Sequence, residues 1–155
     1  MTRRSVRKEA SPDLGILSSR LLFAVQDELF DTLATQGHPE LRPRHGAVLA
    51  YLDEEGSRAT ELAHRSGQHK QVVGKLVDEL EALGYVERRP DPTDRRAKLV
   101  VPTARGLDEM TRSDAILASI EARLAATIGT GAYETFKHTF EQLTGDQRAR
   151  TFVRK

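Results

Sequence analysis

Residues 57–106 read SRATELAHRSGQHKQVVGKLVDELEALGYVERRPDPTDRRAKLVVPTARG, and this stretch decides the fold. A short helical segment is followed by Ser66-Gly67, a dipeptide typical of a turn. A second helical segment comes next, with apolar residues at intervals of three and four, and then two β-rich runs joined by a loop rich in arginine. This order predicts a helix-turn-helix followed by a β-hairpin wing.

The two helices of this stretch have recognisable ends. Thr60 is a suitable N-cap for the first helix, and Gly67 ends it. The second helix is expected from about Gln68 to Leu83, and Gly84 follows where a left-handed cap residue is favoured. Its buried stripe is predicted to comprise Val72, Val73, Leu76, Val77, Leu80 and Leu83.

The expected wing consists of strands over 85–89 and 97–101, with residues 90–96 as the loop between them. Asp91-Pro92 favours a turn, because proline presets the backbone angle of the first central position. A two-stranded hairpin alone is only marginally stable. We therefore expect the wing to pack on the neighbouring helices.

Further helices are predicted on both sides of the winged segment. One is expected from Asp13 to about Thr35, and another from Pro43 to about Gly56. A long helix should begin after the N-cap Thr103 and run to Ile128, and a final helix should follow the glycine-rich break at 129–131. Residues 1–12 are polar and basic, and we expect a flexible basic tail there.

The predicted fold class is mainly α (α+β), a winged helix-turn-helix with flanking helices, and residues 13–155 are expected to form a single domain. The winged part covers about 40–102, and about 13–35 and 103–150 are expected to be dimerisation helices. The apolar stripes of these flanking helices have no obvious place in a small winged core. They form either a bundle within one chain or an interface with a second copy, and we favour the homodimer because symmetric oligomers are common.

Ten residues are candidates for contact with DNA: His69, Lys70, Gln71, Gly74, Lys75, Arg89, Asp94, Arg95, Arg96 and Lys98. The first five lie on the outer face of the second helix, which has the size to enter a major groove. Gln71 is suited to bidentate pairing with adenine, and a lysine to guanine or phosphate. Gly74 costs about 1 kcal/mol in mid-helix relative to alanine, and close approach to a surface would explain it. The alternative is an ordinary surface helix.

The wing strengthens this interpretation. Arg95 and Arg96 at the tip suit a narrow A·T-rich minor groove, whose negative potential attracts inserted arginine. Asp94 is placed to brace the guanidinium of Arg96 by a charge-assisted hydrogen bond. The alternative is a solvated charged loop.

Composition excludes several other classes of function. The 155 residues carry a formal net charge of +1 and no cysteine, so disulfides, thiolate metal sites and cysteine-based redox sensing are absent. The five histidines show no metal-ligand spacing, and no phosphate-binding glycine loop, nucleophile elbow or metalloprotease motif is present. We therefore expect no enzyme activity, no metal and no cofactor. No apolar run is long enough to span a bilayer and no signal peptide is evident, which predicts a cytoplasmic location.

The stretch VVGKLVDELEALGYVERRPDPTDRRAKLVVPTARG resembles the MarR family of winged helix-turn-helix transcriptional regulators. The features that carry the resemblance are Leu80, Gly84, Asp91, Pro92, Asp94 and Arg96, followed by Thr103 and Gly106. About fifty residues match closely, and the flanking helices agree in order and length. Gly74 and Gln71 depart from the residues most common in the family, so base preference does not transfer.

The resemblance implies an obligate homodimer that binds a palindromic operator in double-stranded DNA, usually as a repressor released by a small-molecule effector. It also implies that Arg96 enters the minor groove and that Asp94 braces it. A ligand pocket is expected between the dimerisation helices and the winged part, with Arg44, His45 and Tyr51 as candidate lining residues. The alternative function is a winged-helix module for protein–protein contact without DNA.

Overall fold

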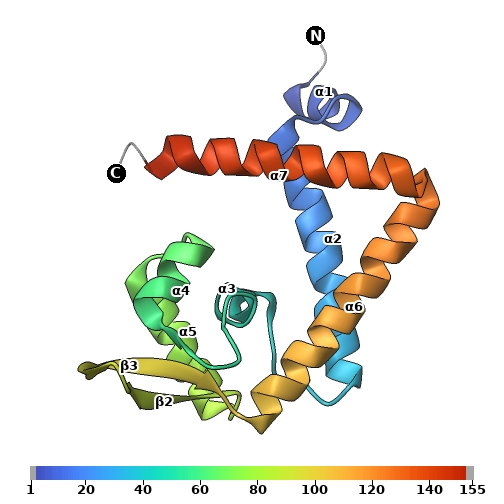
Figure 1. Cartoon of the computed structure of the whole chain (residues 1–155). Coiled ribbons are helices and arrows are strands. Elements are labelled where there is room, and N and C mark those ends of the chain that lie inside the picture. The colour runs from blue at the N-terminus through green and yellow to red at the C-terminus, as the bar shows by residue number, and fades with distance from the viewer. Residues whose placement is uncertain (1–2, 153–155) are drawn as a thin grey trace. The chain divides into compact units, whose positions relative to one another are not determined.

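The computed structural model describes residues 3–152, and the chain divides into two compact units, Met1–Ile116 and Leu117–Lys155. The elements appear in Figure 1 in the order α1 (Arg4–Ala10), α2 (Leu14–Thr35), η1 (Pro43–His45), α3 (Gly46–Leu49), β1 (Ser57–Arg58), α4 (Ala59–Ser66), α5 (Lys70–Ala82), β2 (Val86–Asp91), β3 (Asp94–Pro102), α6 (Ala104–Ile128) and α7 (Thr130–Phe152). The architecture confirms the predicted mainly helical fold with a β-hairpin wing.

The N-terminal segment corrects one expectation. Residues 4–10 form α1, where we expected an irregular tail over 1–12, whose first two residues lie outside the described part of the chain. Arginine, lysine, glutamate and alanine all favour a helix. The amide of Ser11 closes the helix on the carbonyl of Arg7, and Lys8 forms an ion pair with Asp13. Local propensity and one ion pair thus give this segment regular structure.

Helix α2 begins and ends as predicted. Asp13 caps it, since its carboxylate accepts a hydrogen bond from the amide of Ile16 at 3.0 Å. The helix reaches Thr35, and Gly37 follows with a φ of 102°. Its N-terminal half leaves large apolar side chains exposed, among them Leu14, Leu17, Leu21, Leu22 and Phe23.

The segment from Pro43 is shorter than predicted. It forms one 3₁₀ turn and a four-residue helix that ends at Leu49, whereas we expected a helix to about Gly56. The chain turns at 53–56, where the Gly56 amide donates to the Asp53 carbonyl at 2.9 Å. Gly56 has a φ of 102°, and a Cβ there would approach Val101 Cγ2 to 2.9 Å. The turn is required because the chain must enter the sheet immediately afterwards.

A third strand joins the predicted hairpin. Strand β1 pairs antiparallel with β3, with Ser57 opposite Val100 and Arg58 opposite Leu99, so the sheet has the order β1-β3-β2. The strand runs directly into α4, which begins at Ala59. Thr60 therefore lies inside the helix, and its predicted role as N-cap is wrong. Arg58 occupies the cap position without a side-chain cap bond.

The hairpin is longer and its turn tighter than predicted. Strands β2 and β3 leave only Pro92 and Thr93 between them, instead of a loop over 90–96. The pairing shifts between Pro90, opposite Lys98, and Asp91, opposite Asp94. Residues 95–97 are therefore extra on β3, and such an irregularity turns side chains away from the ladder.

The junction between α5, β2 and α6 holds the first unit together. Gly84 has a φ of 80°, and the amides of Gly84 and Tyr85 bond the carbonyls of Glu81 and Leu80, which is a Schellman cap. Gly106 must be glycine, because a Cβ there would lie 2.2 Å from the Tyr85 carbonyl oxygen. The core around this junction consists of Leu62, Val73, Val77, Leu80, Tyr85, Val86 and Val100.

Helices α6 and α7 follow the prediction closely. Thr103 caps α6, since its hydroxyl oxygen accepts from the Gly106 amide at 3.2 Å. Helix α6 runs continuously to Ile128, and Gly129, with a φ of 94°, ends it. On α7, Phe136 and Phe140 stack with ring centroids 5.5 Å apart, yet Phe136 is exposed. Among residues 3–152, no helix is long and apolar enough to cross a membrane.

Candidate nucleic-acid interface

Helix α5 has one buried face and one face open to solvent. Val73, Leu76, Val77 and Leu80 are buried, as predicted. Val72 is 43% exposed, so its assignment to the buried stripe is wrong. The elements that contact α5 are η1, α3, α4 and β2, and they leave Val72 partly open to solvent.

The exposed face begins at the N-terminus of α5. His69, Lys70, Gln71 and Lys75 are exposed, and Gly74 is half-buried. The cap residue His69 makes no side-chain cap bond, and the first turn contains no acidic residue. The first amides of α5 are therefore open, and the positive end of the helix dipole is not neutralised there. No atom of the described residues would lie within 4 Å of a Cβ at Gly74, so packing within the chain does not demand glycine.

The acidic second half of α5 is neutralised internally. Arg88 on β2 donates to Asp78 and to Glu81, in both cases at 2.6 Å. Arg44 donates to Glu79 at 2.9 Å, and the buried His45 contacts the same carboxylate oxygen at 3.1 Å. These bonds fix α5 to η1 on one side and to β2 on the other.

The Glu79 cluster shows shifted pKa values with clear causes. Hydrogen bonds from Arg44 and then from His45 lower the pKa of Glu79. Burial lowers the pKa of His45, which favours the neutral ring. The geometry agrees, because the Nδ1 atom accepts from the Arg42 amide at 3.0 Å and the proton is left on Nε2, facing Glu79.

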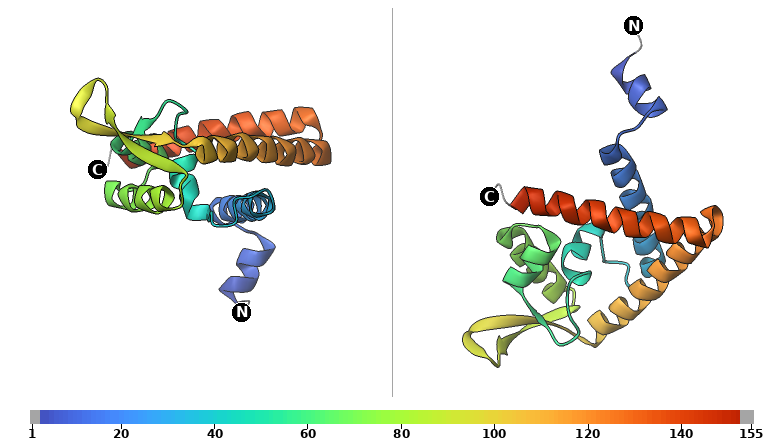
Figure 2. Two further views of the ribbon diagram at one scale, coloured as in Figure 1. Left: turned by 90° about the horizontal axis from the view of Figure 1, so that it is seen from below. Right: turned by 45° about the horizontal axis from the view of Figure 1, so that its top comes forward.

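The wing turn is organised around the buried carboxylate of Asp91. Its Oδ1 atom accepts from the amide of Thr93 at 2.8 Å and from the Thr93 hydroxyl at 2.7 Å. Its Oδ2 atom accepts from Arg58 Nε at 2.7 Å. Thr93, followed by Arg58, lowers the pKa of Asp91 to about 2. The projecting hairpin that this turn closes is visible beyond α4 and α5 (Figure 2).

Asp94 acts differently from the prediction. Its Oδ1 atom accepts from the backbone amide of Arg96 at 3.0 Å and thereby fixes the backbone of the irregular segment. The predicted brace to the Arg96 guanidinium is wrong. A carboxylate two residues earlier in a turn reaches the main-chain amide more readily than the end of a long side chain.

The basic residues fall into two groups. Arg44, Arg58 and Arg88 are held in ion pairs with acidic side chains, and Arg89 pairs with its neighbour Glu87. A second group is exposed and makes no ion pair with any residue in the described part of the chain: Lys70, Lys75, Arg95, Arg96 and Lys98. This group lies at the beginning of α5 and on β3 beside the wing turn. Of the ten predicted DNA contacts, these five carry the uncompensated charge.

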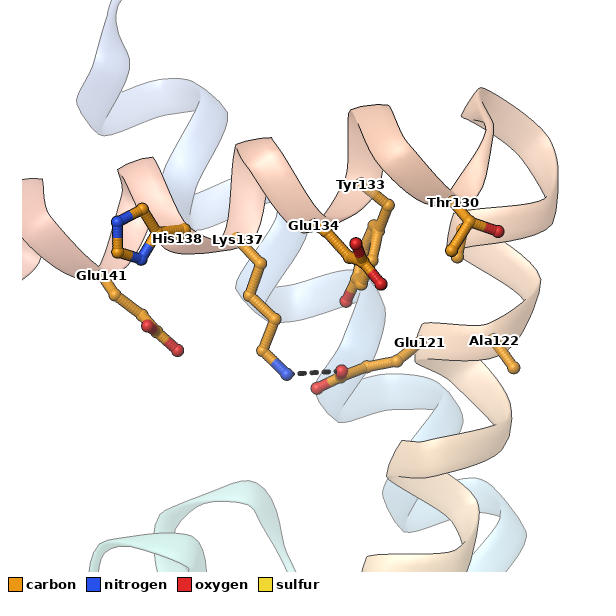
Figure 3. Close-up of a pocket in the computed structure, with 9 residues that line it drawn as sticks. Glu121, Ala122, Thr130, Tyr133, Glu134, Lys137, His138 and Glu141 are labelled. Atoms are coloured by element: carbon orange, nitrogen blue, oxygen red, sulfur yellow. Dashed lines mark hydrogen bonds and ion pairs between the residues drawn. The ribbon is translucent and has the colours of Figure 1, made fainter.

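The three candidate ligand residues are not gathered at one cavity. Arg44 and His45 meet at Glu79, while Tyr51 is 37% exposed and offers its carbonyl to Arg65. An open cavity of about 430 Å³ lies within the second unit, lined by Tyr133, His138 and the Lys137–Glu121 ion pair of 2.6 Å (Figure 3). It does not include the three candidates, whose role in ligand binding stays a prediction.

Sequence reasoning missed Arg58, Thr93, Glu79 and the pairing of Arg88. Thr93 was detectable, because threonine two residues after aspartate is a common way to close an Asx turn. Arg58 and Glu79 make contacts across 33, 34 or 35 residues. Arg88 reaches Glu81 and Asp78, 7 and 10 residues earlier, only because β2 folds back beside α5.

Comparisons with known proteins agree with this geometry. A model of the MarR family matches residues 40–97. CouR from Rhodococcus jostii RHA1, solved with bound p-coumaroyl-CoA, is 30% identical and aligns with a TM-score of 0.69 over 86% of this chain and 92% of CouR. The chain belongs to the MarR family.

Two further relatives of this MarR-family protein extend the comparison. The structure of the transcriptional repressor CouR bound to a 23-mer DNA duplex is 25% identical, with a TM-score of 0.71 over 88% of this chain and 95% of that one. The uncharacterized HTH-type transcriptional regulator YcgE of Bacillus subtilis (strain 168) is 46% identical over 52 residues, which span 33% of this chain and about a third, 34%, of YcgE. The protein is thus a winged-helix transcriptional regulator, and these relatives are regulators rather than enzymes.

Proposed function

We propose that this protein is a cytoplasmic regulator that binds a palindromic operator in double-stranded DNA as a homodimer and represses transcription until a small-molecule effector releases it. The observation that carries the proposal is the group of five exposed, unpaired cations at the start of α5 and on the wing. A surface of this kind gains free energy from phosphates, because no carboxylate among residues 3–152 forms an ion pair with it.

The two parts of this surface suit the two grooves of DNA. Helix α5 presents His69, Lys70, Gln71 and Lys75 from its first two turns, where a recognition helix meets base edges. Arg95 and Arg96 project from the irregular part of β3, in a position suited to a minor groove. The relative CouR binds a DNA duplex, which supports the same role here.

The proposed homodimer is supported by the exposed apolar side chains of the flanking helices. Helix α2 exposes a series of leucines in its N-terminal half, and α7 exposes Phe136 and Leu143. Exposed apolar series of this length mark interaction surfaces, and a palindromic operator requires a two-fold partner. We assign 40–102 to DNA binding and 13–35 with 103–150 to dimerisation, and we regard 13–155 as one functional domain because α6 continues from one compact unit into the other.

The effector is proposed to be a small organic molecule, since CouR binds p-coumaroyl-CoA. Arg44, His45 and Tyr51 remain the candidate lining residues. Arg44 and His45 already contact Glu79 on α5, so a ligand that competed for either side chain would loosen an anchor of the recognition helix.

Selection of bound duplexes from a random pool tests this function. We expect an inverted repeat whose half-sites are separated by about one helical turn of 10–10.5 base pairs, with A·T-rich flanks. Recovery of no enriched duplex at low salt would reject DNA binding. The protein–protein module would then be the better account, and a reproducible non-palindromic site would reject the symmetric homodimer as the bound form.

A further inference from the structure

The side chain of Arg58 connects the wing turn to the helix-turn-helix. Arg58 belongs to β1, which has two residues and leads directly into α4. Its Nη2 atom lies 2.5 Å from Asp91 Oδ2, and its Nε atom lies 2.7 Å from the same oxygen. Two nitrogens of one guanidinium thus contact the same carboxylate oxygen, which belongs to a residue 33 positions later in the chain.

The Asp91 carboxylate that Arg58 contacts is buried and therefore needs hydrogen-bond partners within the protein. Asp91 is 5% exposed, and a buried carboxylate without charge-assisted partners is costly. The Oδ1 atom is occupied by Thr93, so Arg58 supplies the compensation at Oδ2. The low pKa of Asp91, about 2, agrees with a carboxylate that stays ionised in this arrangement.

Arg58 also reaches the segment that carries the wing arginines. Its Nη2 atom lies 4.0 Å from Asp94 Oδ2, and the other oxygen of Asp94 accepts from the Arg96 amide at 3.0 Å. Arg58 therefore lies between two carboxylates. Asp91 closes the wing turn, and Asp94 fixes the backbone at Arg96. Extra residues on one strand, as here between Asp94 and Lys98, re-aim side chains, and the bond from the Arg96 amide to Asp94 fixes the backbone at this point.

We propose that Arg58 is a positioning residue for DNA recognition, which holds Asp91 and Asp94 so that Arg96 is presented to the minor groove at a fixed place relative to α4 and α5. The inference rests on the proposed function. Arg58 acts through the wing and makes no contact with phosphate in this account, because its charge is already shared by two carboxylates.

The test compares Arg58→Gln and Arg58→Lys with the wild-type protein in the free state and with the selected duplex. Arg112→Gln is the control, since Arg112 is 41% exposed against 42% for Arg58 and is likewise ion-paired, with Asp108, but lies on α6, away from the wing in the sequence. Circular dichroism and thermal melting establish that each variant is folded. Amide hydrogen exchange of Thr93 and Arg96 in the absence of DNA reports on the turn itself.

For Arg58→Gln we expect about tenfold faster exchange at both amides, operator affinity lower by about tenfold, and a weaker preference for A·T-rich over G·C-rich flanks. Arg58→Lys should restore affinity only in part, because an ammonium lacks the fork geometry. The dependence of affinity on salt should keep its slope in both variants, and Arg112→Gln should behave as the wild type.

Unchanged exchange with an unchanged flank preference in Arg58→Gln would overturn the positioning role. A salt slope reduced by about one, with unchanged exchange, would also overturn it and would make Arg58 a phosphate contact. Failure of the wild-type protein to bind any duplex would reject the proposed function together with this role. The wild-type titration therefore separates the failure of the function from the failure of the inference.

Discussion

The winged segment and the flanking helices differ in how far their apolar side chains are exposed to solvent. In the winged segment, Leu62, Val73, Val77 and Leu80 have no solvent-exposed surface at all. Helix α2, by contrast, leaves Leu14 61% exposed, and α7 leaves Leu143 51% exposed. The winged segment supplies its own core within one chain, whereas the flanking helices carry apolar surface that only another surface would bury.

This difference in exposure corresponds to a large free energy of burial. Full burial of one leucine or phenylalanine contributes about 1.5–3 kcal/mol, so a helix with several exposed leucines forgoes a gain comparable with the whole stability of a domain. Association with a second copy recovers this gain on both chains at once. The winged segment therefore needs no second chain to bury its core, and the exposed apolar side chains of the flanking helices are the surface on which the proposed dimer depends.

The largest expected effect comes from breaking the proposed dimer surface. Leu17→Asp combined with Leu21→Asp places two carboxylates on the exposed stripe of α2 without touching a buried residue. We expect a folded monomer in sedimentation velocity, with operator affinity lower by about 100-fold or more, because the second half-site is no longer bound by a linked subunit.

Arg20→Asp is the control, since Arg20 is an exposed polar residue of the same helix, so its replacement removes no apolar side chain. It should leave the dimer intact. If the double variant still sediments as a dimer, the α2 stripe is not the interface.

The next largest effect is expected from the difference between the buried and the exposed face of α5. Leu80→Ala removes a fully buried side chain and should lower the free energy of unfolding by about 2–5 kcal/mol. Val72→Ala removes a side chain that is 43% exposed and should cost less than about 1 kcal/mol. Urea denaturation of both variants measures the difference. Equal losses would mean that the two faces of α5 are not distinct.

Gly74 allows stability and recognition to be separated. The new methyl group of Gly74→Ala would have no neighbour within 4 Å from the rest of residues 3–152, and the variant should stabilise α5 by about 1 kcal/mol in thermal or chemical unfolding. If the backbone of α5 approaches the major groove closely at this point, the same variant should bind the operator more weakly. A variant that is more stable and binds equally well would show that Gly74 does not face DNA.

The smallest expected effect concerns pH. Burial raises the pKa of Glu109, whose Oε2 atom has no hydrogen-bond partner within the described part of the chain, while Oε1 accepts from Ser113. Its contribution to stability is therefore greatest below the ordinary glutamate pKa and declines as pH rises through the raised value. Glu109→Gln should flatten this decline and raise the unfolding free energy at pH 7 by about 1 kcal/mol or less. Parallel melting curves of wild type and variant from pH 4 to pH 8 would contradict the assignment.

Much of the fold was predictable because its signals are local. The repeating leucines of α2, the left-handed glycines at 84 and 129 and the cap at Thr103 each act over one or two turns. The wing sequence around Asp91 and Asp94 was enough to indicate the family. These features depend on residues that are neighbours in the sequence.

The remaining features depend on distant residues. Strand β1 has two residues, which carry no periodicity, and it exists because Val100 and Leu99 pair with them. The exposure of Val72 depends on how much of α5 the neighbouring elements cover. The bond from Asp94 to the Arg96 amide, in place of the predicted bond to its guanidinium, depends on the irregular register of the hairpin.

The central claim is that the unpaired cations of α5 and the wing contact the phosphates and the minor groove of DNA. The most direct measurement is the operator affinity of the wild-type protein and of Arg96→Ala as a function of salt concentration. We expect the logarithm of the wild-type association constant to fall with the logarithm of salt concentration with a slope steeper than about −4. Arg96→Ala should bind about tenfold more weakly, as a dimer of unchanged stability. A wild-type slope near zero, or equal affinities of wild type and Arg96→Ala, would contradict the account.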